Sequence, residues 1–289
     1  MSKQTVVIYH ADCLDGFGGA YAAWKKLGDA AEYRPKKHGE APPDDLSGCE
    51  VFMIDFSYEK EVLERIEKEA ASFVILDHHM GARDAVESMK NHIFDNDRSG
   101  ASIAWSYFNP DTSVPRLISY IEDNDLWRNS LKNAGPVAAY LSTLPWEFPV
   151  WDRAMSEFQD DAQFEKIVEK GSHYREYVEH ALTIFERDAE LVEFEGHTVY
   201  AVNVPRLFRS ELGNILAKKH PPFAIVWYAY GSQWRCSLRG TGEVDVSKIA
   251  AKYGGNGHHN AASFRIPDDQ PFPWTPVGKQ SLPTGQVKE

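Results

Sequence analysis

TVVIYHADCLDGFGG, residues 5–19, joins a short apolar run to a cluster of His, Asp and Cys and then to small residues. The apolar run Val6–Tyr9 predicts a β-strand, and the Ala-rich segment Gly18–Leu27 predicts the helix that follows it. Two further apolar runs, Val51–Ile54 and Phe73–Leu76, predict strands, with the charged amphipathic helix Glu59–Ala71 between them. This alternation of strands and helices is typical of a parallel sheet that is covered by helices on both faces.

The remainder of the chain predicts more helices and then a second, smaller α/β domain. Helices are expected at Ser99–Tyr107, at Arg116–Ile121 and, as one or two long helices, within Glu157–Glu193. The second domain is expected to contain strands His197–Val204, Phe223–Tyr230 and Gln233–Leu238 and helices Ser210–Lys219 and Val246–Tyr253. We therefore expect an N-terminal domain over 1–185, a second domain over 190–268 and a Pro-rich tail over 269–289.

Composition narrows the classes of function. The 289 residues carry a formal net charge of -12, which disfavours binding to a long nucleic acid duplex because that binding needs many phosphate contacts. The three cysteines form no C-x-x-C pair, which favours a reducing compartment, and no apolar run reaches the length of a membrane helix. We expect a cytoplasmic protein without a membrane partner, with a homodimer as one option for its assembly.

Each of the three predicted strands of the first half ends in side chains that can bind a metal. These side chains are His10, Asp12 and Asp15 after the first strand, Asp55 after the second, and Asp77, His78 and His79 after the third. Ligands of an open parallel sheet bind outside the carboxyl ends of its strands. One such Asp is often only a helix cap, but the recurrence at three strand ends favours a metal site.

Carboxylate and imidazole ligands without cysteine pairs suit Mn²⁺, with Mg²⁺, Fe²⁺, Co²⁺ or Zn²⁺ as alternatives. A shared carboxylate such as Asp55 is suited to bridge two ions roughly 3.5–4 Å apart. Two acidic segments offer one more carboxylate: Glu122–Trp127, through Asp123 or Asp125, and Asp95–Asp97. Both segments also read as ordinary turns.

The second domain has a cluster of its own at Gly254–Asn260, with the sequence GGNGHHN. Glycines such as Gly255 and Gly257 let a ligand approach the backbone, and exposed N–H groups bind anions. Such a loop is also a common turn between a helix and a strand. The side chains that are expected to bind phosphate or base are His258, His259, Asn260 and Arg239, with Arg206 and Arg209 as weaker candidates.

Together these motifs resemble the DHH phosphoesterase superfamily. Asp77-His78-His79 resembles its name-giving signature, Tyr9–Gly16 its first motif, and Ile54-Asp55 its second. Asp123 falls where the family has its fourth motif, with Asp125 as the other option, and Gly254–Asn260 is similar to the motif of the DHH-associated C-terminal domain. The resemblance covers nearly the whole chain apart from the tail.

The resemblance implies that the first domain binds two Mn²⁺ ions and that the second binds substrate phosphate or nucleotide. The metal ligands that it implies are His10, Asp15, Asp55, His78 and Asp123, with Asp55 bridging and with Asp77 and His79 supporting the site. The first motif departs from the family pattern, because Cys13 stands where the first aspartate is expected and Asp12 is one residue away. Either Asp12 substitutes, or Cys13 is itself a ligand and favours a softer ion such as Zn²⁺, or the site is weakened.

The expected function is hydrolysis of phosphoester bonds in small nucleotides or short oligonucleotides by a water that two metals activate. Asp55, Asp77, His78 and His79 are the expected catalytic residues. One alternative is a single-strand exonuclease. The other, from a different class, is a nucleotide-binding sensor with a degraded metal site, which Cys13 brings into consideration.

Overall fold

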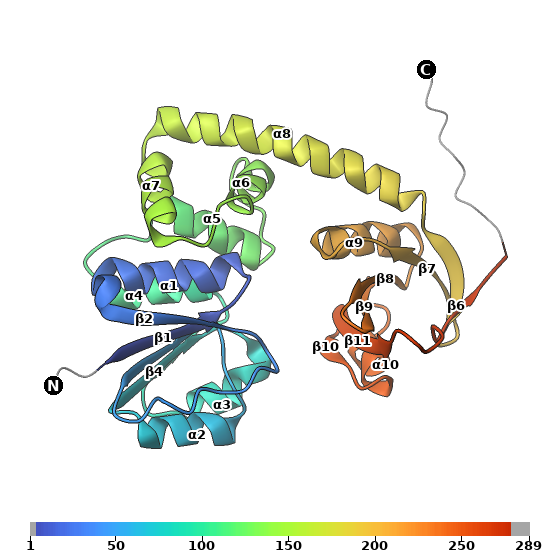
Figure 1. Ribbon diagram of the computed structural model, residues 1–289. Coiled ribbons are helices and arrows are strands. Elements are labelled where there is room, and N and C mark those ends of the chain that lie inside the picture. The colour runs from blue at the N-terminus through green and yellow to red at the C-terminus, as the bar shows by residue number, and fades with distance from the viewer. Residues whose placement is uncertain (1–3, 279–289) are drawn as a thin grey trace. The chain divides into compact units, whose positions relative to one another are not determined.

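A computed structural model of the chain describes residues 4–278, which belong to two compact units (Figure 1). Unit 1 comprises Met1–Arg175 and unit 2 comprises Glu176–Glu289. The boundary lies inside helix α8 (Asp161–Glu186), ahead of the change of domain expected after residue 185. The early part of α8 packs on the core of unit 1, through Ile167, and its late part on unit 2, through Leu182.

Unit 1 contains a parallel sheet of five strands in the order β2-β1-β3-β4-β5. The strands are β1 (Thr5–His10), β2 (Ala31–Lys36), β3 (Glu50–Ile54), β4 (Ser72–Asp77) and β5 (His92–Phe94). The helices are α1 (Leu14–Leu27), α2 (Lys60–Glu69), α3 (Arg83–Glu87), α4 (Gly100–Phe108), α5 (Arg116–Asp125), α6 (Ala134–Leu141) and α7 (Phe148–Gln159), with 3-10 turns η1 (Gly28–Ala30) and η2 (Met80–Ala82). The predicted α/β class with a parallel N-terminal sheet is confirmed.

Alternation along the strands divides the apolar side chains of unit 1 between two cores. Val7 and Ile54 face the core that α1, α4 and α5 cover, whereas Val6, Ile8 and Met53 face the core under α2 and α3. Figure 1 shows these two groups of helices on opposite faces of the sheet. Burial of each such side chain stabilises the fold by about 1.5–3 kcal/mol, so the two cores fix which ends of the strands lie side by side.

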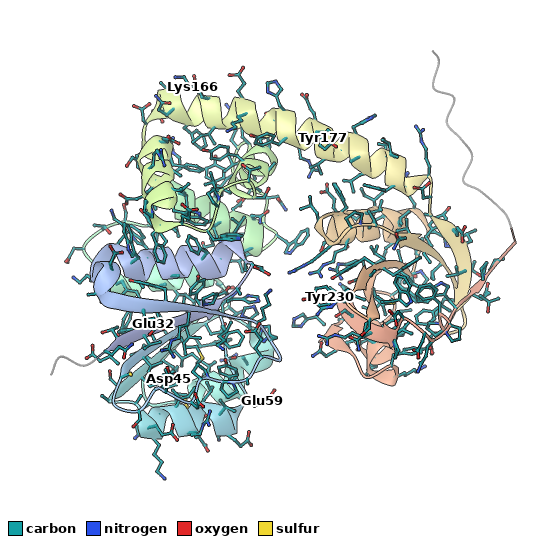
Figure 2. The ribbon with its side chains drawn as sticks, in the orientation of Figure 1. Glu32, Asp45, Glu59, Lys166, Tyr177 and Tyr230 are labelled. Carbon is teal, nitrogen blue, oxygen red and sulfur yellow. The ribbon has the colours of Figure 1, made fainter. Side chains whose placement is uncertain are left out.

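Strand β2 forms one edge of this sheet, and its sequence is polar, AEYRPK. Pro35 pairs with Tyr9 of β1. Arg34 forms ion pairs with Glu32 of the same strand, at 2.8 Å, and with Asp45 of the following loop, at 2.6 Å. Glu32 and Asp45 are labelled in Figure 2. The loop is thus held against the outer strand by charge.

Unit 2 contains a mixed sheet of seven strands in the order β10-β11-β9-β8-β7-β6-β12. The strands are β6 (Glu190–Phe194), β7 (His197–Asn203), β8 (Phe223–Tyr230), β9 (Gln233–Gly240), β10 (Asn256–His258), β11 (Ala261–Pro267) and β12 (Thr275–Pro276). Helix α9 (Arg209–Lys219), preceded by η3 (Arg206–Phe208), packs on one face, and α10 (Val246–Lys252) packs on the other. The predicted second α/β domain is confirmed.

Part of the expected tail belongs to this sheet, because Thr275–Pro276 pair with β6. Residues 279–289 of that tail lie outside the described residues. Between residues 4 and 278, no helix combines the length and the apolar character that crossing a lipid bilayer requires.

Candidate functional site

The carboxyl ends of β1, β3 and β4 meet at one level of the sheet. The parallel register pairs Tyr9 with Ile54, and Ile54 with Leu76. The residue after each of these positions is therefore His10, Asp55 or Asp77, and the Asp55 N–H donates to the Leu76 carbonyl at 2.9 Å. The three strand ends that the sequence singled out are thus adjacent in the structure.

Three overlapping groups of side chains at this edge are arranged so that one metal-ligand atom from each member lies within 4.8 Å of the others. They are His10, Cys13 and Asp55; Asp15, His78 and Asp125; and Asp55, Asp77, His78 and His79. The first two groups have no member in common. We call them ligand group A (His10, Cys13, Asp55) and ligand group B (Asp15, His78, Asp125).

Asp55 belongs to ligand group A and also lies beside His78 of ligand group B. Its Oδ2 is 3.4 Å from His10 Nδ1 and its Oδ1 is 3.1 Å from His78 Nε2. The side chain is 1% exposed, and Oδ2 has no hydrogen-bond partner among the described residues. Burial acts to raise the pKa of this carboxyl, but the neighbouring ring nitrogens of His10 and His78 outweigh it and hold the pKa well below its usual range.

Asp15 is held by the start of helix α4. Its two oxygens accept from the backbone N–H groups of Gly100, at 2.6 Å, and Ala101, at 2.9 Å. A helix N-terminus favours a carboxylate because its first N–H groups are unpaired and its dipole is positive there. Burial and the charges of Asp55 and Asp125 nevertheless raise the Asp15 pKa well above its usual value.

Gly100 allows helix α4 to lie this close to Asp15 and Asp55. A Cβ at Gly100 would lie 2.5 Å from Asp55 Cβ and 3.0 Å from Asp15 Oδ2. Both distances are at or below the limit of real contacts, so helix α4 can lie against the two carboxylates only with glycine at this position.

Asp77 orients the histidines that follow it. Its Oδ1 accepts from the backbone N–H groups of His78, at 2.7 Å, and His79, at 3.2 Å, and it lies 2.7 Å from His79 Nδ1. Burial lowers the pKa of His79, but the hydrogen bond with Asp77 and the charge of Asp55 raise it to about 9. The carboxylate therefore fixes the ring and holds a proton on Nδ1.

Of the two candidates in the first motif, the structure brings Cys13 into the ligand groups and not Asp12. Asp12 has φ 55, in the left-handed region, and its carboxylate forms an ion pair with Lys37 at 2.7 Å. Cys13 follows with extended backbone as the N-cap of α1. Burial and the charges of Asp55 and Asp15 raise the pKa of the Cys13 thiol.

In the fourth motif, Asp125 rather than Asp123 joins the ligand groups. Asp125 Oδ2 lies 3.6 Å from His78 Nε2, and burial together with the charge of Asp55 raises the pKa of Asp125. Asp123 is 3% exposed, and its carboxylate accepts from the backbone N–H and the hydroxyl of Ser130 and from the N–H of Leu131. It organises the loop after α5. Asp95 accepts from the N–H of Asp97 in a turn and belongs to none of the groups.

His38 was not singled out from the sequence, yet its ring lies 5.2 Å from that of His10 and 6.4 Å from that of His79. Burial and the charges of these two histidines lower its pKa. It follows β2, which the sequence did not reveal as a strand, so no signal marked it as another residue at a strand end.

These residues suit divalent cations. Burial and the charge of Asp55 raise the pKa values of both Asp15 and Asp125, so a bound cation would stabilise the charged forms of these carboxylates. Asp55 Oδ2 and Asp77 Oδ2 are buried without a hydrogen-bond partner among residues 4–278, so each has a lone pair available to a cation. Oxygen and imidazole donors are the ligands that Mn²⁺, Mg²⁺ and Zn²⁺ use in proteins.

Unit 2 contains a pocket of about 260 Å³ with a basic lining. Its residues are Arg209, Tyr228, Arg235, Ser237, Tyr253, Gly254, Gly255, Asn256, Ser263, Phe264 and Arg265. Arg235 of β9 pairs directly with Arg265 of β11, so two guanidinium groups come from adjacent strands. Arg235 Nε is buried without a hydrogen-bond partner among the described residues, and its guanidinium lies 4.1 Å from the ring centre of Tyr230, labelled in Figure 2. We call this the arginine pocket.

The residues predicted in unit 2 lie partly inside and partly outside the arginine pocket. Gly255 lines it, whereas Gly257, His258, His259 and Asn260 continue into β10 and an exposed turn. His259 Nε2 lies 3.1 Å from the Gly242 carbonyl. Arg239 does not line the pocket but donates to Ser210 Oγ at 2.9 Å, and burial together with the charge of Arg209 lowers its pKa to about 10.

Arg206, one of the weaker candidates, lies in η3 and outside the lining, whereas Arg209 belongs to the lining. Arg235 and Arg265 were missed, although alternation with buried Cys236 and Leu238 places Arg235, Ser237 and Arg239 on one face of β9.

No family model matches the sequence. An uncharacterised protein of Acanthamoeba polyphaga mimivirus is 31% identical over 285 residues, which cover 90% of this chain and 66% of the viral protein. Oligoribonuclease NrnB of Bacillus subtilis is 25% identical over 242 residues, which cover 76% of this chain and 60% of NrnB. The chain thus spans about two thirds or less of the length of these curated relatives.

Solved structures share the fold at low sequence identity. A DHH domain from a member of the s1p family of ribosomal proteins matches with TM-score 0.59 and 14% identity, covering 90% of this chain and 82% of that one. The pGpG-specific phosphodiesterase PggH of Vibrio cholerae matches with TM-score 0.50 and 12% identity, covering 92% and 94%. RecJ of Thermus thermophilus in complex with Mn²⁺ matches with TM-score 0.51 and 12% identity, covering 91% and 49%. The chain thus shares its fold with DHH-domain proteins, and its strand-end motifs resemble those of the DHH phosphoesterase superfamily.

Proposed function

We propose that this protein is a metal-dependent phosphoesterase that hydrolyses small nucleotides or short oligonucleotides with two divalent ions, preferably including Mn²⁺. The observation that carries the proposal is the position of buried Asp55, whose Oδ2 lies beside His10 of group A and whose Oδ1 lies beside His78 of group B. Shared carboxylates of this kind are typical of two-metal hydrolytic sites.

Group A, group B and the residues around Asp77 would hold the ions. Ions bound there supply Lewis acidity, which activates water and offsets negative charge on a phosphoryl group. The α4 N-terminus fixes Asp15, and the Asp77 carboxylate fixes the ring of His79. Because His79 Nδ1 is engaged with Asp77, its Nε2 is the ring nitrogen that can donate to a phosphoryl oxygen.

The arginine pocket of unit 2 supports a phosphorylated substrate. Guanidinium groups bind phosphate through paired N–H donors, and Arg209, Arg235 and Arg265 line one cavity beside the backbone of Gly254 and Gly255. A cavity of about 260 Å³ suits one phosphate with part of a nucleoside rather than a long strand. The activities of NrnB, an oligoribonuclease, and PggH, a pGpG-specific phosphodiesterase, are consistent with a short substrate.

The test is a hydrolysis assay with a ribodinucleotide, a nucleoside bisphosphate and a long single strand, with Mn²⁺ present and after its removal by chelator. We expect turnover of at least one small substrate, dependence on the ion, and a loss of more than about 100-fold in Asp55→Asn. The control is Asp29→Asn, a surface aspartate that accepts from Trp24 Nε1 and lies past the end of α1 opposite to Cys13 and Asp15. Equal rates in wild type and Asp55→Asn would refute the proposal, and preference for the long strand would favour the exonuclease.

A further inference from the structure

Ligand groups A and B differ in their chemistry. Group B offers only carboxylate oxygen and imidazole nitrogen, whereas group A adds the sulfur of Cys13. We propose that the two metal positions are unequal: Cys13 coordinates the ion of group A, which therefore takes a thiophilic ion such as Zn²⁺, while group B takes a harder ion such as Mn²⁺. This inference rests on the metal centre of the proposed function and specifies which ions it selects.

The backbone of the first motif turns the sulfur inward. The left-handed residue Asp12 directs its carboxylate to Lys37, at 2.7 Å, so that this oxygen is engaged in an ion pair. Cys13 comes next in extended conformation and caps α1, where its carbonyl accepts from the Phe17 N–H at 3.1 Å. The residue at the start of the helix is thus held beside Asp55 by the helix itself.

A second observation marks group A as a cation site. Asp55 Oδ2 is the oxygen on the His10 side, 3.4 Å from Nδ1, and it is buried without a hydrogen-bond partner among the described residues. Asp55 is only 1% exposed. A carboxylate oxygen in this position is costly unless a cation or a donor satisfies it, and an ion that also binds His10 and Cys13 would do so.

The other two cysteines occupy different environments. Cys49 is buried, and its Sγ donates to the Asp45 carbonyl at 3.8 Å. Cys236 is buried in the core of the second sheet. Neither belongs to a group of metal-ligand side chains in the described part of the chain. They are therefore matched controls for the presence of a thiol that is not a ligand.

Sulfur changes metal preference because thiolate is a soft ligand. It favours Zn²⁺ over Mn²⁺ and Mg²⁺, whereas carboxylate and imidazole sets accept Mn²⁺. Zinc–sulfur bonds are about 2.3 Å long and zinc–nitrogen bonds about 2.0–2.1 Å. The two kinds of ligand are thus distinguishable by X-ray absorption spectroscopy without any measurement of activity.

The experiment loads the full chain with one equivalent of Zn²⁺ and records zinc-edge X-ray absorption for wild type, Cys13→Ser and Cys49→Ser. We expect a sulfur scatterer at about 2.3 Å in wild type and Cys49→Ser, and none in Cys13→Ser. Competition titrations should show that Cys13→Ser binds Zn²⁺ at least about tenfold more weakly, while Mn²⁺ binding at group B persists. Cys13→Asp should shift the selectivity of group A from Zn²⁺ towards Mn²⁺.

Two results would overturn the inference: a zinc shell of nitrogen and oxygen alone in wild type, or a sulfur scatterer that survives in Cys13→Ser. With either result, metal-dependent hydrolysis by wild type leaves the proposed function standing. Failure of the wild-type chain to bind any divalent ion would remove the metal centre, and both proposals with it.

Discussion

Gly100 offers a test of the metal centre that changes none of its ligands. In Gly100→Ala the added methyl would lie 2.5 Å from Asp55 Cβ and 3.0 Å from Asp15 Oδ2. Carbon atoms in contact are separated by about 3.5–4.0 Å, so helix α4 and Asp55 must move apart by about 1 Å. Overpacking of this kind costs about 1–3 kcal/mol of unfolding free energy, and a 1 Å misplacement of a reacting group costs about 100-fold in rate.

The control is Gly135→Ala, at the second residue of α6, where an added Cβ meets nothing within 4 Å. Because Pro136 follows this glycine and disfavours a Cβ on a helical residue before it, alanine gains little of its usual helix propensity, and we expect only a small change in stability. Unfolding in denaturant with chelator measures the stability change, and calorimetric titration with Mn²⁺ measures the metal affinity. We expect Gly100→Ala to lose both metal affinity and hydrolysis while Gly135→Ala keeps them. Wild-type metal affinity in Gly100→Ala would contradict the packing of α4 against Asp55.

Three further substitutions test separate parts of the site. Asp123→Asn should destabilise the metal-free protein by about 1–3 kcal/mol at pH 7, because its carboxylate accepts three hydrogen bonds. Burial acts to raise the Asp123 pKa, but those hydrogen bonds outweigh it and lower the pKa. The difference in unfolding free energy between wild type and Asp123→Asn should therefore be complete above the unfolded pKa of about 3.9 and vanish as the pH falls through the lower folded pKa. An equal difference at every pH would refute this account. Asp125→Asn should abolish binding of the group B ion yet stabilise the chelated protein, because burial and Asp55 raise the Asp125 pKa and its charge opposes folding; unchanged metal binding would exclude it as a ligand. Arg235→Ala should weaken binding of inorganic phosphate about 10–100-fold by calorimetry, compared with the exposed Arg187→Ala, and equal affinities would remove the arginine pocket from substrate recognition.

The sequence was sufficient to predict the strand ends because they depend on a short-range pattern. The runs before His10, Asp55 and Asp77 are apolar and bounded by polar residues, and the parallel register then brings the three ends together. Strand β2 was missed because AEYRPK has neither an apolar run nor a clear alternation. An edge strand can have such a sequence, because one side of its backbone pairs with no other strand. His38, which follows it, was missed for the same reason.

Which of two neighbouring side chains enters the site depends on local backbone geometry. The left-handed conformation of Asp12 decides that Cys13 lies beside Asp55, and no residue type in the motif requires that conformation. Asp123 and Asp125 are two residues apart on one helix, about 200° around its axis, so only one of them can face His78. The phase of the helix, which depends on packing in three dimensions, selects Asp125.

The arginine pocket shows a limit of another kind. Arg235 and Arg265 are 30 positions apart in sequence, and they meet because β9 and β11 are neighbours with Arg235 opposite Arg265. The Gly-rich loop could be recognised from the sequence, but the pairing of two strands that are so far apart in the chain could not. Only the pairing of strands identifies which arginines stand beside Gly255.

The polar edge strand β2 limits how copies of this protein can associate. Pro35 has no N–H group to offer to an added strand, and the side chains of Glu32 and Arg34 are tied to each other and to Asp45 beside that edge. A second copy therefore cannot continue the five-stranded sheet through β2 by regular hydrogen bonding. A homodimer of this protein would have to use another surface, such as the β5 edge, the helices or the sheet of unit 2, and mass measurements on variants of those surfaces would locate its interface.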